Sequence, residues 1–562
     1  MLKKHGIKYC IKYYSIVYFL LFAAVLVALN PFIIKLFGTA THVTTDSIFY
    51  TCYKIAIPIL LTCTWGYLFL SHLRERRYHY LTGRNYYKDQ QYHRSYSELI
   101  EYFKDADPYR IDANTLPSVS WKNAEGMILG TKKGRLFHIQ SGKDGQNFLI
   151  IGRPSSGKTA GPIIASCLRV GMHHPLSKTE HHTDASVFCI DLKNDIWKAT
   201  HEYRNIKRFN LMDTDDSCHY NPFHGIEHLS MDERCNFIEN IGFNIVPTLT
   251  EGNSRYFSET AQDFWNGIAL YLLHQDIHTS FPSVIKAILA GNPVGWIKKI
   301  VASDCVEAKR RLQSKWGENE KNLSGGYSNL AQCCRKFASN KLFFLLDNNP
   351  DYEYISVQTL EDGYDCYLTI DQAELANYSA LLSLVVQGFL TGFLHREANS
   401  NSARLPDGTL RPIWMMLDEF AQLKTLSYDI VSSSLMTLRS RNVNICMAIQ
   451  SLSSLSEMWN EKAAKSLIDT ISTFVILSIQ EISTREWASK LIGDRKVLRI
   501  SNSINDASNG RQNSGKSVQE ATEPIFPPEQ WGNLIDKKMG RDELVVYTNG
   551  KYIKLDKQYY FK

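Results

Sequence analysis

The chain reads Gly152-Arg153-Pro154-Ser155-Ser156-Gly157-Lys158-Thr159, which is a complete G-x-x-x-x-G-K-[ST] phosphate-binding loop. The loop follows an apolar run, Asn147–Ile151, and precedes residues 160–170, which can continue as a helix. This strand–loop–helix context separates a functional loop from a chance glycine-rich turn. In such a loop, backbone N–H groups curl round a β-phosphate, and the helix presents the positive end of its dipole to the same anion. The stretch therefore predicts an α/β nucleotide-binding fold.

Two side chains of the loop have predicted chemical roles. We expect Lys158 to reach the β- and γ-phosphate oxygens and the Thr159 hydroxyl to hold Mg²⁺. The remaining residues supply the backbone cradle; these are Gly152, Arg153, Pro154, Ser155, Ser156 and Gly157. The cofactors expected from the loop are therefore a nucleoside triphosphate, ATP, and Mg²⁺.

A second element of this site comes much later in the chain. Residues 412–417 read PIWMML, the continuous apolar run of a buried parallel strand, and Asp418 and Glu419 follow it. Ligands bind at the carboxyl ends of such strands. We expect Asp418 to hold Mg²⁺ through water and Glu419 to orient and deprotonate the attacking water. The pattern is weak alone, but beside an intact phosphate loop it favours ATP hydrolysis over nucleotide storage.

A third apolar strand pattern, Val443–Ile449, is followed by Gln450. A glutamine at that edge can hydrogen-bond the γ-phosphate or its water, and the alternative is an ordinary polar residue at a strand end. Arg439 and Arg441 lie just before this strand, where a cation can reach the nucleotide of a neighbouring subunit. Arginine is suited to spreading the transition-state charge of phosphoryl transfer. The alternative is that one or both are ordinary surface arginines.

Length and composition limit the class of protein. The 562 residues are too many for one compact core, so two or three domains are expected, and 44% hydrophobic content is typical of a globular protein. The net charge of +6 neither demands nor excludes a nucleic-acid partner. The 12 cysteines include no C-x-x-C pair, so we expect reduced thiols rather than disulfides or a zinc site.

The N-terminal region predicts a membrane anchor, residues 1–75, with two transmembrane helices at about residues 16–35 and 50–70. Four lysines precede the first apolar run, and three arginines follow the second, whereas the connecting loop holds little charge. By the positive-inside rule, both ends face the cytoplasm of a bacterial inner membrane. The alternative is a cleaved signal peptide, which would leave the arginine cluster on the wrong side of the second span.

The pattern beyond the anchor predicts one α/β domain with an insertion. Short apolar strands alternate with helices over residues 76–257, helical periodicity dominates residues 258–400, and strand patterns resume over residues 401–562. Since Asp418 comes only after the helices, an all-α domain inserted into the α/β domain explains the order better than two consecutive domains.

Two segments fit no motif. His173, His174, His181 and His182 could bind a metal, but an extended surface loop is the favoured reading. Residues 501–517 are rich in Ser, Asn and Gly, and we expect a loop without regular structure before the final strands.

The order of these motifs resembles that of the type IV secretion coupling proteins, the TraG/TraD-like membrane ATPases of conjugation and secretion. The shared elements follow the phosphate loop in the chain and are FCIDLKND with Asp191 and Lys193, HYNPF with Tyr220, LDEFAQL with Asp418 and Glu419, Gln450, and EPIFPPEQWGNL. The first of these departs from the family's D-P-K-G-E pattern at Leu192, Asn194 and Asp195. The resemblance covers nearly the whole chain.

This resemblance implies a RecA-like motor domain, an inserted all-helical domain and homo-hexameric rings. It also implies secretion-channel components as partners, together with DNA carrying its relaxase or protein effectors as substrates. An FtsK-type DNA translocase is the first alternative, and such a protein is expected to carry a DNA-reading C-terminal module. A docking platform that uses nucleotide only to assemble is the second, and the intact Lys158, Asp418 and Glu419 weigh against it.

Overall fold

The computed structural model of the protein describes residues 67–68, 71–72, 109–142, 145–247, 252–396, 404–506, 512–536 and 540–561. Residues 109–495, 522–536 and 541–562 belong to one compact unit. The two predicted membrane spans lie outside the described residues, except that Tyr67 and Leu68 are helical. Within the described part of the chain, one helical stretch is long and apolar enough to cross a membrane, Gln372–Leu394, and 61% of its apolar 18-residue window is buried.

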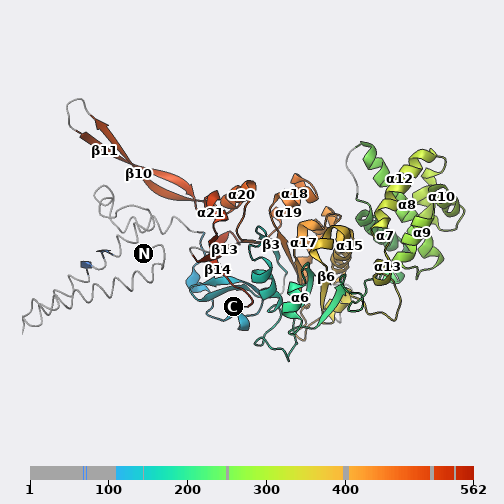
Figure 1. The fold of residues 1–562 in the computed structure, drawn as a ribbon, viewed down its shortest axis with the longest axis horizontal. Coiled ribbons are helices and arrows are strands. Elements are labelled where there is room, and N and C mark those ends of the chain that lie inside the picture. The colour runs from blue at the N-terminus through green and yellow to red at the C-terminus, as the bar shows by residue number, and fades with distance from the viewer. Residues whose placement is uncertain are drawn as a thin grey trace, which may run out of the picture. The chain divides into compact units, whose positions relative to one another are not determined.

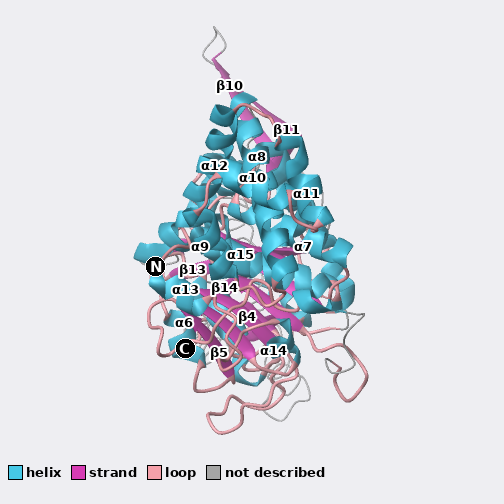
Figure 2. Ribbon diagram, turned by 90° about the vertical axis from the view of Figure 1, so that its right-hand side faces the viewer, coloured by secondary structure: helices cyan, strands magenta, loops and turns pink. Residues whose placement is uncertain are grey.

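The compact unit is built on a twelve-stranded sheet in the order β2-β1-β14-β13-β9-β3-β8-β7-β4-β6-β5, with β12 paired to β13 (Figures 1 and 2). The strands are β1 (Met127–Lys132), β2 (Arg135–Ile139), β3 (Asn147–Ile151), β4 (Ser186–Asp191), β5 (Ile206–Asn210), β6 (Asp365–Thr369), β7 (Ile413–Leu417), β8 (Val443–Ile449), β9 (Thr473–Ile476), β12 (Ile535–Asp536), β13 (Arg541–Thr548) and β14 (Lys551–Lys557). From β9 to β5 the pairing is parallel, and from β2 to β9 it is antiparallel.

The central strands are buried on both faces, which explains their continuous apolar runs. The runs predicted as strands β3, β7 and β8 are confirmed within one residue at each end. In the sheet, β8 lies between β3 and β7, with Ile151 opposite Ile449 and Leu417 opposite Met447. The carboxyl ends of these three strands therefore meet at one edge.

Helices cover this sheet and form a separate group beside it (Figure 1). Those associated with the strands are α5 (Ile164–Cys167), α6 (Asp195–Thr200), α14 (Val357–Glu361), α15 (Leu375–Leu394), α17 (Tyr428–Thr437), α18 (Ser453–Met458), α19 (Glu461–Asp469), α20 (Ile482–Ile492) and α21 (Pro528–Gly532). The helical group contains α7 (Met231–Ile245), α8 (Gly252–Gln275), α9 (Phe281–Ala290), α10 (Pro293–Val301), α11 (Val306–Leu312), α12 (Glu320–Arg335) and α13 (Asn340–Leu345).

Close packing joins the helices of this group. A Cβ atom at Gly242 of α7 would lie 2.6 Å from the Trp265 ring of α8, so only glycine permits that approach. The Trp265 Nε1 group donates a hydrogen bond of 3.0 Å to the Ile238 carbonyl. Ser280 caps α9, and Pro282 occupies its first turn, where no N–H group is needed. The helical periodicity predicted for residues 258–400 appears in α8, α9, α11 and α15, among others.

The structure corrects the expected all-α character of residues 258–400. Strand β6 lies inside this range and pairs with β4 and β5 in the central sheet. Helix α15 follows it and packs with its mostly buried side chains in the same core. The sequence analysis missed β6 because DCYLT is short, with three apolar residues between Asp365 and Thr369, and lies between strong helical patterns, where periodicity cannot separate a buried strand from a buried helix. The other domain boundaries stay predictions.

The expectation of irregular structure over residues 501–517 is wrong. Strand β10 (Asp494–Asp506) pairs with β11 (Gln512–Pro524) in a two-stranded sheet of its own. Residues 507–511, between the two strands, lie outside the described residues. A composition rich in Ser, Asn and Gly suggested a loop because such residues are depleted in strands, but paired backbone groups outweigh that weak preference.

A buried ion pair joins β6 to the layer above the sheet. Arg204 Nε donates to Asp365 Oδ2 at 2.5 Å and Arg204 Nη2 donates to Asp365 Oδ1 at 3.1 Å, with both side chains almost fully buried. The guanidinium also donates to the carbonyls of Val170 and Ala185, and Asp365 accepts from the N–H of Val187. All hydrogen-bonding groups of the pair are therefore engaged, as a buried ion pair requires.

We predict that Arg204→Met lowers the free energy of unfolding by about 3–5 kcal/mol, because it leaves the Asp365 carboxylate buried without its cation. Chemical denaturation of the detergent-solubilised chain measures the change. Lys178→Met is the control, since it breaks the exposed ion pair between Lys178 and Glu202 and should leave stability unchanged. Equal stability of the two variants would contradict this account of the pair.

Candidate nucleotide-binding site

The phosphate-binding loop has the backbone of an anion cradle. Ser155 and Gly157 adopt left-handed conformations, with φ of 59° and 86°. The loop is anchored at its start, because the N–H of Arg153 donates to the Ser478 carbonyl at 2.9 Å and the N–H of Ser156 donates to the Arg153 carbonyl at 3.1 Å. Residues of alternating hand turn successive N–H groups toward one point, which is the geometry that binds phosphate.

The helix after the loop begins with an unusual turn, and Pro162 explains it. Residues Thr159–Ile163 form a π-helical turn before α5. In an α-helix the Lys158 carbonyl would accept from residue 162, but proline has no N–H group. Instead, the N–H of Ile163 donates to the Lys158 carbonyl at 3.2 Å. The expected strand–loop–helix order is confirmed, with one widened turn at its centre.

The phosphate loop and the acidic pair Asp418 and Glu419 lie in contact, as the sequence predicted. The Thr159 hydroxyl donates to Asp418 Oδ2 at 2.8 Å, and Lys158 Nζ lies 3.9 Å from Glu419 Oε1 while donating to the Gly152 carbonyl at 2.7 Å. The register of β3, β8 and β7 produces this meeting, because residues following parallel strands reach the same sheet edge.

Burial governs the electrostatics of the site. It lowers the pKa of Lys158, and the nearby carboxylates of Glu419 and Asp418 partly oppose that shift. Burial also raises the pKa of Asp418, whereas the hydrogen bond from Thr159 acts in the opposite direction. Both charges are therefore poorly solvated, and a ligand that carries opposite charge gains more here than in water.

Glu419 and Gln450 are brought together at the mouth of the site. Glu419 has a left-handed backbone with φ of 49°, which ends β7 sharply and turns its carboxylate toward the end of β8. Gln450 Nε2 donates to Glu419 Oε2 at 3.1 Å. The Glu419 carboxylate is half-buried and the Gln450 amide is exposed, so both groups can hydrogen-bond to one water that lies beside their contact.

Arg439 and Arg441 lie at the opposite edge of the sheet. They belong to the 3-10 turn Leu438–Arg441 before β8, and Arg439 Nε donates to the carbonyl of Gly145, just before β3, at 3.3 Å. Arg441 is half-buried and donates to the Phe393 carbonyl at 3.3 Å. The structure therefore does not bring either arginine to the phosphate loop of its own chain.

The segment after β4 forms a tight turn that explains its sequence. Asp191 accepts hydrogen bonds from the N–H groups of Lys193, Asp195 and Trp197. Asn194 has a left-handed backbone with φ of 60°, a conformation in which asparagine is the commonest substitute for glycine. Asn194, which replaces the glycine of the family's D-P-K-G-E pattern, therefore preserves the turn. Lys193 is exposed, and its charge adds a little to the lowering of the Lys158 pKa that burial causes.

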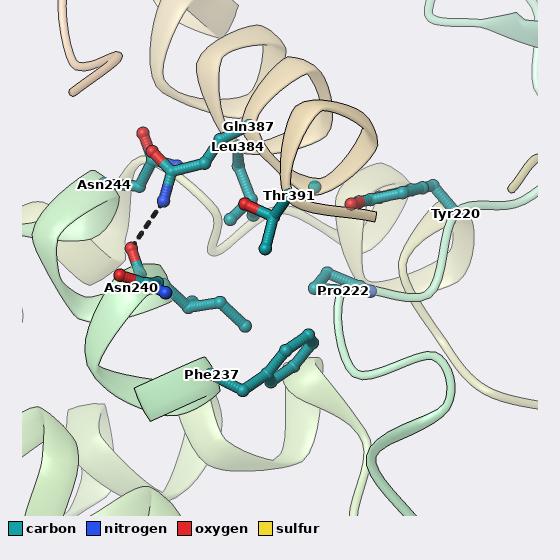
Figure 3. A pocket seen from close by; sticks show the side chains of 10 residues that line it. Tyr220, Pro222, Phe237, Asn240, Asn244, Leu384, Gln387 and Thr391 are labelled. Carbon is teal, nitrogen blue, oxygen red and sulfur yellow. Dashed lines mark hydrogen bonds between the residues drawn. The ribbon is translucent and has the colours of Figure 1, made fainter. Parts of the chain in front are cut away.

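Tyr220 and Pro222 serve packing rather than the phosphate site. Figure 3 shows them around a pocket between α7 and α15, with Phe237 on the opposite wall. The Tyr220 hydroxyl approaches α15 so closely that a Cβ atom at Gly388 would lie 2.0 Å from it. Gln387 Nε2 donates to the Asn240 carbonyl at 2.7 Å across the pocket. This motif therefore fixes how the helical group joins the sheet layer.

The four histidines of the histidine-rich loop do not gather into a group of three potential metal ligands. His173 and His182 lie 3.6 Å and 3.8 Å from the Asp184 carboxylate and are largely exposed. No group of three metal-ligating side chains occurs anywhere in the described residues. The surface-loop interpretation agrees with this geometry. None of the described cysteines forms a disulfide, as expected for reduced thiols.

The donor set fits a magnesium nucleotide. The Thr159 hydroxyl and the Asp418 carboxylate are the hard oxygen ligands that Mg²⁺ prefers. In the same loop, the Ser156 hydroxyl is buried and has no hydrogen-bond partner among the described residues. The sequence analysis missed the contact between Lys557, the last residue of β14, and the Ser156 carbonyl of this loop. No local pattern marks a contact between residues that lie so far apart in the chain.

Comparison with known proteins agrees with this architecture. The family model described as type IV secretory system conjugative DNA transfer matches residues 112–562. The chain is 22% identical to Protein VirD4 of Rhizobium rhizogenes over 458 residues, which are 78% of this chain and 62% of that protein. It is 23% identical to Protein VirD4 of Agrobacterium fabrum over 427 residues, covering 74% and 58%. The chain therefore spans about 60% of the length of these curated relatives.

Solved structures share the fold. Plasmid coupling protein TrwB in complex with the ATP analogue ADPNP aligns with a TM-score of 0.56 at 13% identity, over 80% of this chain and 91% of that chain. TrwB in complex with ADP and Mg²⁺ aligns with a TM-score of 0.56 at 14% identity, over 78% and 90%. The predicted RecA-like α/β fold with a helical domain is thus confirmed.

We predict that Asp418→Asn raises the stability of the protein at neutral pH in magnesium-free buffer. Because burial raises the pKa of Asp418 above its unfolded value, its favourable contribution is complete below the unfolded pKa and is lost as the pH rises through the folded pKa. Asparagine cannot ionise, so the advantage of the variant should grow toward neutral pH and vanish below about pH 4. Thermal unfolding across pH measures it, and a variant less stable than wild type at pH 7 would contradict the assignment.

Proposed function

Since the chain belongs to the type IV secretory system conjugative DNA-transfer family, we propose that it is a membrane-anchored coupling ATPase that binds ATP and Mg²⁺ and passes substrates to a type IV secretion channel. The observation that carries this proposal is the convergence of Lys158, Thr159, Asp418, Glu419 and Gln450 at one sheet edge. The TrwB structures with ADPNP and with ADP and Mg²⁺ support the choice of cofactors.

Each residue of the site then has a role in ATP hydrolysis. Lys158 holds the β- and γ-phosphate oxygens once the nucleotide displaces its contact with the Gly152 carbonyl. Thr159 and Asp418 would hold Mg²⁺, which would supply charge neutralisation at the phosphates. Glu419 accepts a proton from the attacking water, and Gln450 orients that water through its contact with Glu419. The N–H groups of Ser155 and Gly157 would bind the phosphates, because those of Gly152, Arg153 and Ser156 donate to protein carbonyls and Pro154 has no N–H group.

The assembly extends the same proposal beyond the described residues. Residues 1–75 would anchor the chain in the bacterial inner membrane through helices at about 16–35 and 50–70, with both termini in the cytoplasm. A homo-hexameric ring would let Arg439 or Arg441 act in trans, because both lie at the sheet edge away from the nucleotide of their own chain. Partners would be channel components, and substrates would be DNA with its relaxase or protein effectors.

We predict that Glu419→Gln binds ATP with unchanged affinity but lowers kcat about 10²–10⁴-fold, because glutamine cannot accept the proton from water. Steady-state ATPase assays and calorimetric titration with ATP separate the two effects. Lys158→Ala is the matched comparison and should lose ATP affinity itself. A Glu419→Gln variant with wild-type turnover would remove Glu419 as the base, and a wild-type chain that binds ATP without turnover would favour the docking-platform function.

We also predict that single-stranded DNA stimulates the ATPase activity of the detergent-solubilised chain and that the stimulation falls as salt rises. Contacts to DNA phosphates release counterions, so the apparent DNA affinity should fall steeply between about 50 and 200 mM salt. Turnover that ignores DNA at every salt concentration would shift the proposal to protein effectors as the substrate. Lys158→Ala serves as the control for contaminating ATPases.

A further inference from the structure

The segment at the end of β14 packs against the phosphate loop and the start of the helix that follows the loop. Lys557 is the last residue of β14, and residues 558–561 continue along the start of the helix that follows the loop. The N–H of Tyr560 donates to the Ala160 carbonyl at 3.3 Å. Three side chains of this region, Asp542, Lys557 and Tyr559, make a connected set of contacts with the loop.

Lys557 forms a direct hydrogen bond with the backbone of the phosphate loop. Its side chain is fully buried, and its Nζ donates to the Ser156 carbonyl at 2.7 Å and to Asp542 Oδ1 at 2.7 Å. Burial lowers the pKa of Lys557, and the Asp542 carboxylate opposes the shift. A buried cation that donates to a backbone carbonyl and to a carboxylate makes hydrogen bonds of the strong, charge-assisted kind.

Asp542 joins this lysine to a tyrosine that closes over Gly157. The Tyr559 hydroxyl donates to Asp542 Oδ2 at 2.7 Å, so the two carboxylate oxygens serve the two residues separately. A Cβ atom at Gly157 would lie 2.9 Å from the Tyr559 hydroxyl oxygen and 3.3 Å from its ring. Position 157 therefore requires glycine for two reasons. Its backbone is left-handed, and the Tyr559 side chain leaves no room for a Cβ atom.

These contacts fix the peptide group that matters for phosphate binding. The Ser156 carbonyl and the Gly157 N–H belong to one planar trans peptide, in which they point in opposite directions. When Lys557 holds the carbonyl, the Gly157 N–H is turned away from Lys557. The left-handed backbone of Ser155 is strained for a residue with a Cβ atom and persists only where neighbouring contacts hold it.

We propose that Asp542, Lys557 and Tyr559 are positioning residues that hold the Ser156–Gly157 peptide in its phosphate-binding orientation and thereby set the affinity of the site for ATP. The three residues act through the loop backbone. The inference rests on the proposed ATP site. It adds a requirement that the loop sequence alone does not contain, namely an intact β13–β14 hairpin beside it.

The test is the dissociation constant for ATP with Mg²⁺, measured by calorimetry on the full chain in detergent. Lys557→Met should raise it about tenfold, the equivalent of one charge-assisted hydrogen bond, with unchanged binding stoichiometry. Tyr559→Phe removes only the hydroxyl and should raise it a few-fold. Lys557→Arg, which keeps the charge and the donors, should recover part of the loss. In turnover assays KM should rise while kcat at saturating ATP stays within about twofold, whereas a loss of folded protein would lower kcat instead.

Lys554→Met is the matched control. Lys554 lies on the same strand and pairs with Glu543 of β13 at 2.6 Å, but it makes no contact with the loop. Its ATP affinity should equal that of wild type. An unchanged dissociation constant in Lys557→Met, or an equal rise in Lys554→Met, overturns the proposal. If Lys557→Met does not fold, Tyr559→Phe decides alone. A wild-type chain that binds no ATP refutes the ATP site itself, which is a different result.

Discussion

The hydrogen bond from Thr159 to Asp418 joins two residues separated by 259 positions in the chain, and the site depends on that meeting. It forms only because β3, β8 and β7 are parallel neighbours whose carboxyl ends share one edge. A slip of one residue in β7 would turn Asp418 to the other face of the sheet, because side chains alternate along a strand. The apolar runs that bury these strands therefore also set the geometry of the chemistry.

Burial at that edge has two opposed effects. It makes the ionised forms of Lys158 and Asp418 unfavourable, as the directions of their pKa shifts indicate. The same low polarity strengthens each interaction with phosphate and metal. The site thus stores an electrostatic penalty in the nucleotide-free protein and recovers it on binding, so stability and ligand affinity are set by the same two side chains.

Local patterns were enough to predict the central strands and the residues at their ends. Each of β3, β7 and β8 is a continuous apolar run that closes on the chemistry-bearing residue, so one window of sequence contains both signals. The prediction missed strand β6 because its five residues lie among helices. It missed the β10–β11 pair because the composition of that segment resembles a loop. The contact between Lys557 and Ser156 spans 401 positions, and no window of sequence contains both partners. Pairings of that kind are set by the fold, not by local preference.

Strand β14, which ends at Lys557, also forms hydrogen bonds with the first residues of the compact unit. The Tyr552 carbonyl accepts from the N–H of Ile111, and the Tyr552 N–H donates to the Tyr109 carbonyl, each at 2.8 Å. Tyr552 and Lys557 are five residues apart on β14, a span of about 17 Å along an extended strand. Strand β14 is also paired on both sides, with β1 and β13, which leaves it little freedom to bend. The first residues of the unit and the phosphate loop therefore rest on one stiff element. Because β14 is paired on both sides, Lys557 at its end and Tyr559 just beyond it can hold the phosphate loop in one position.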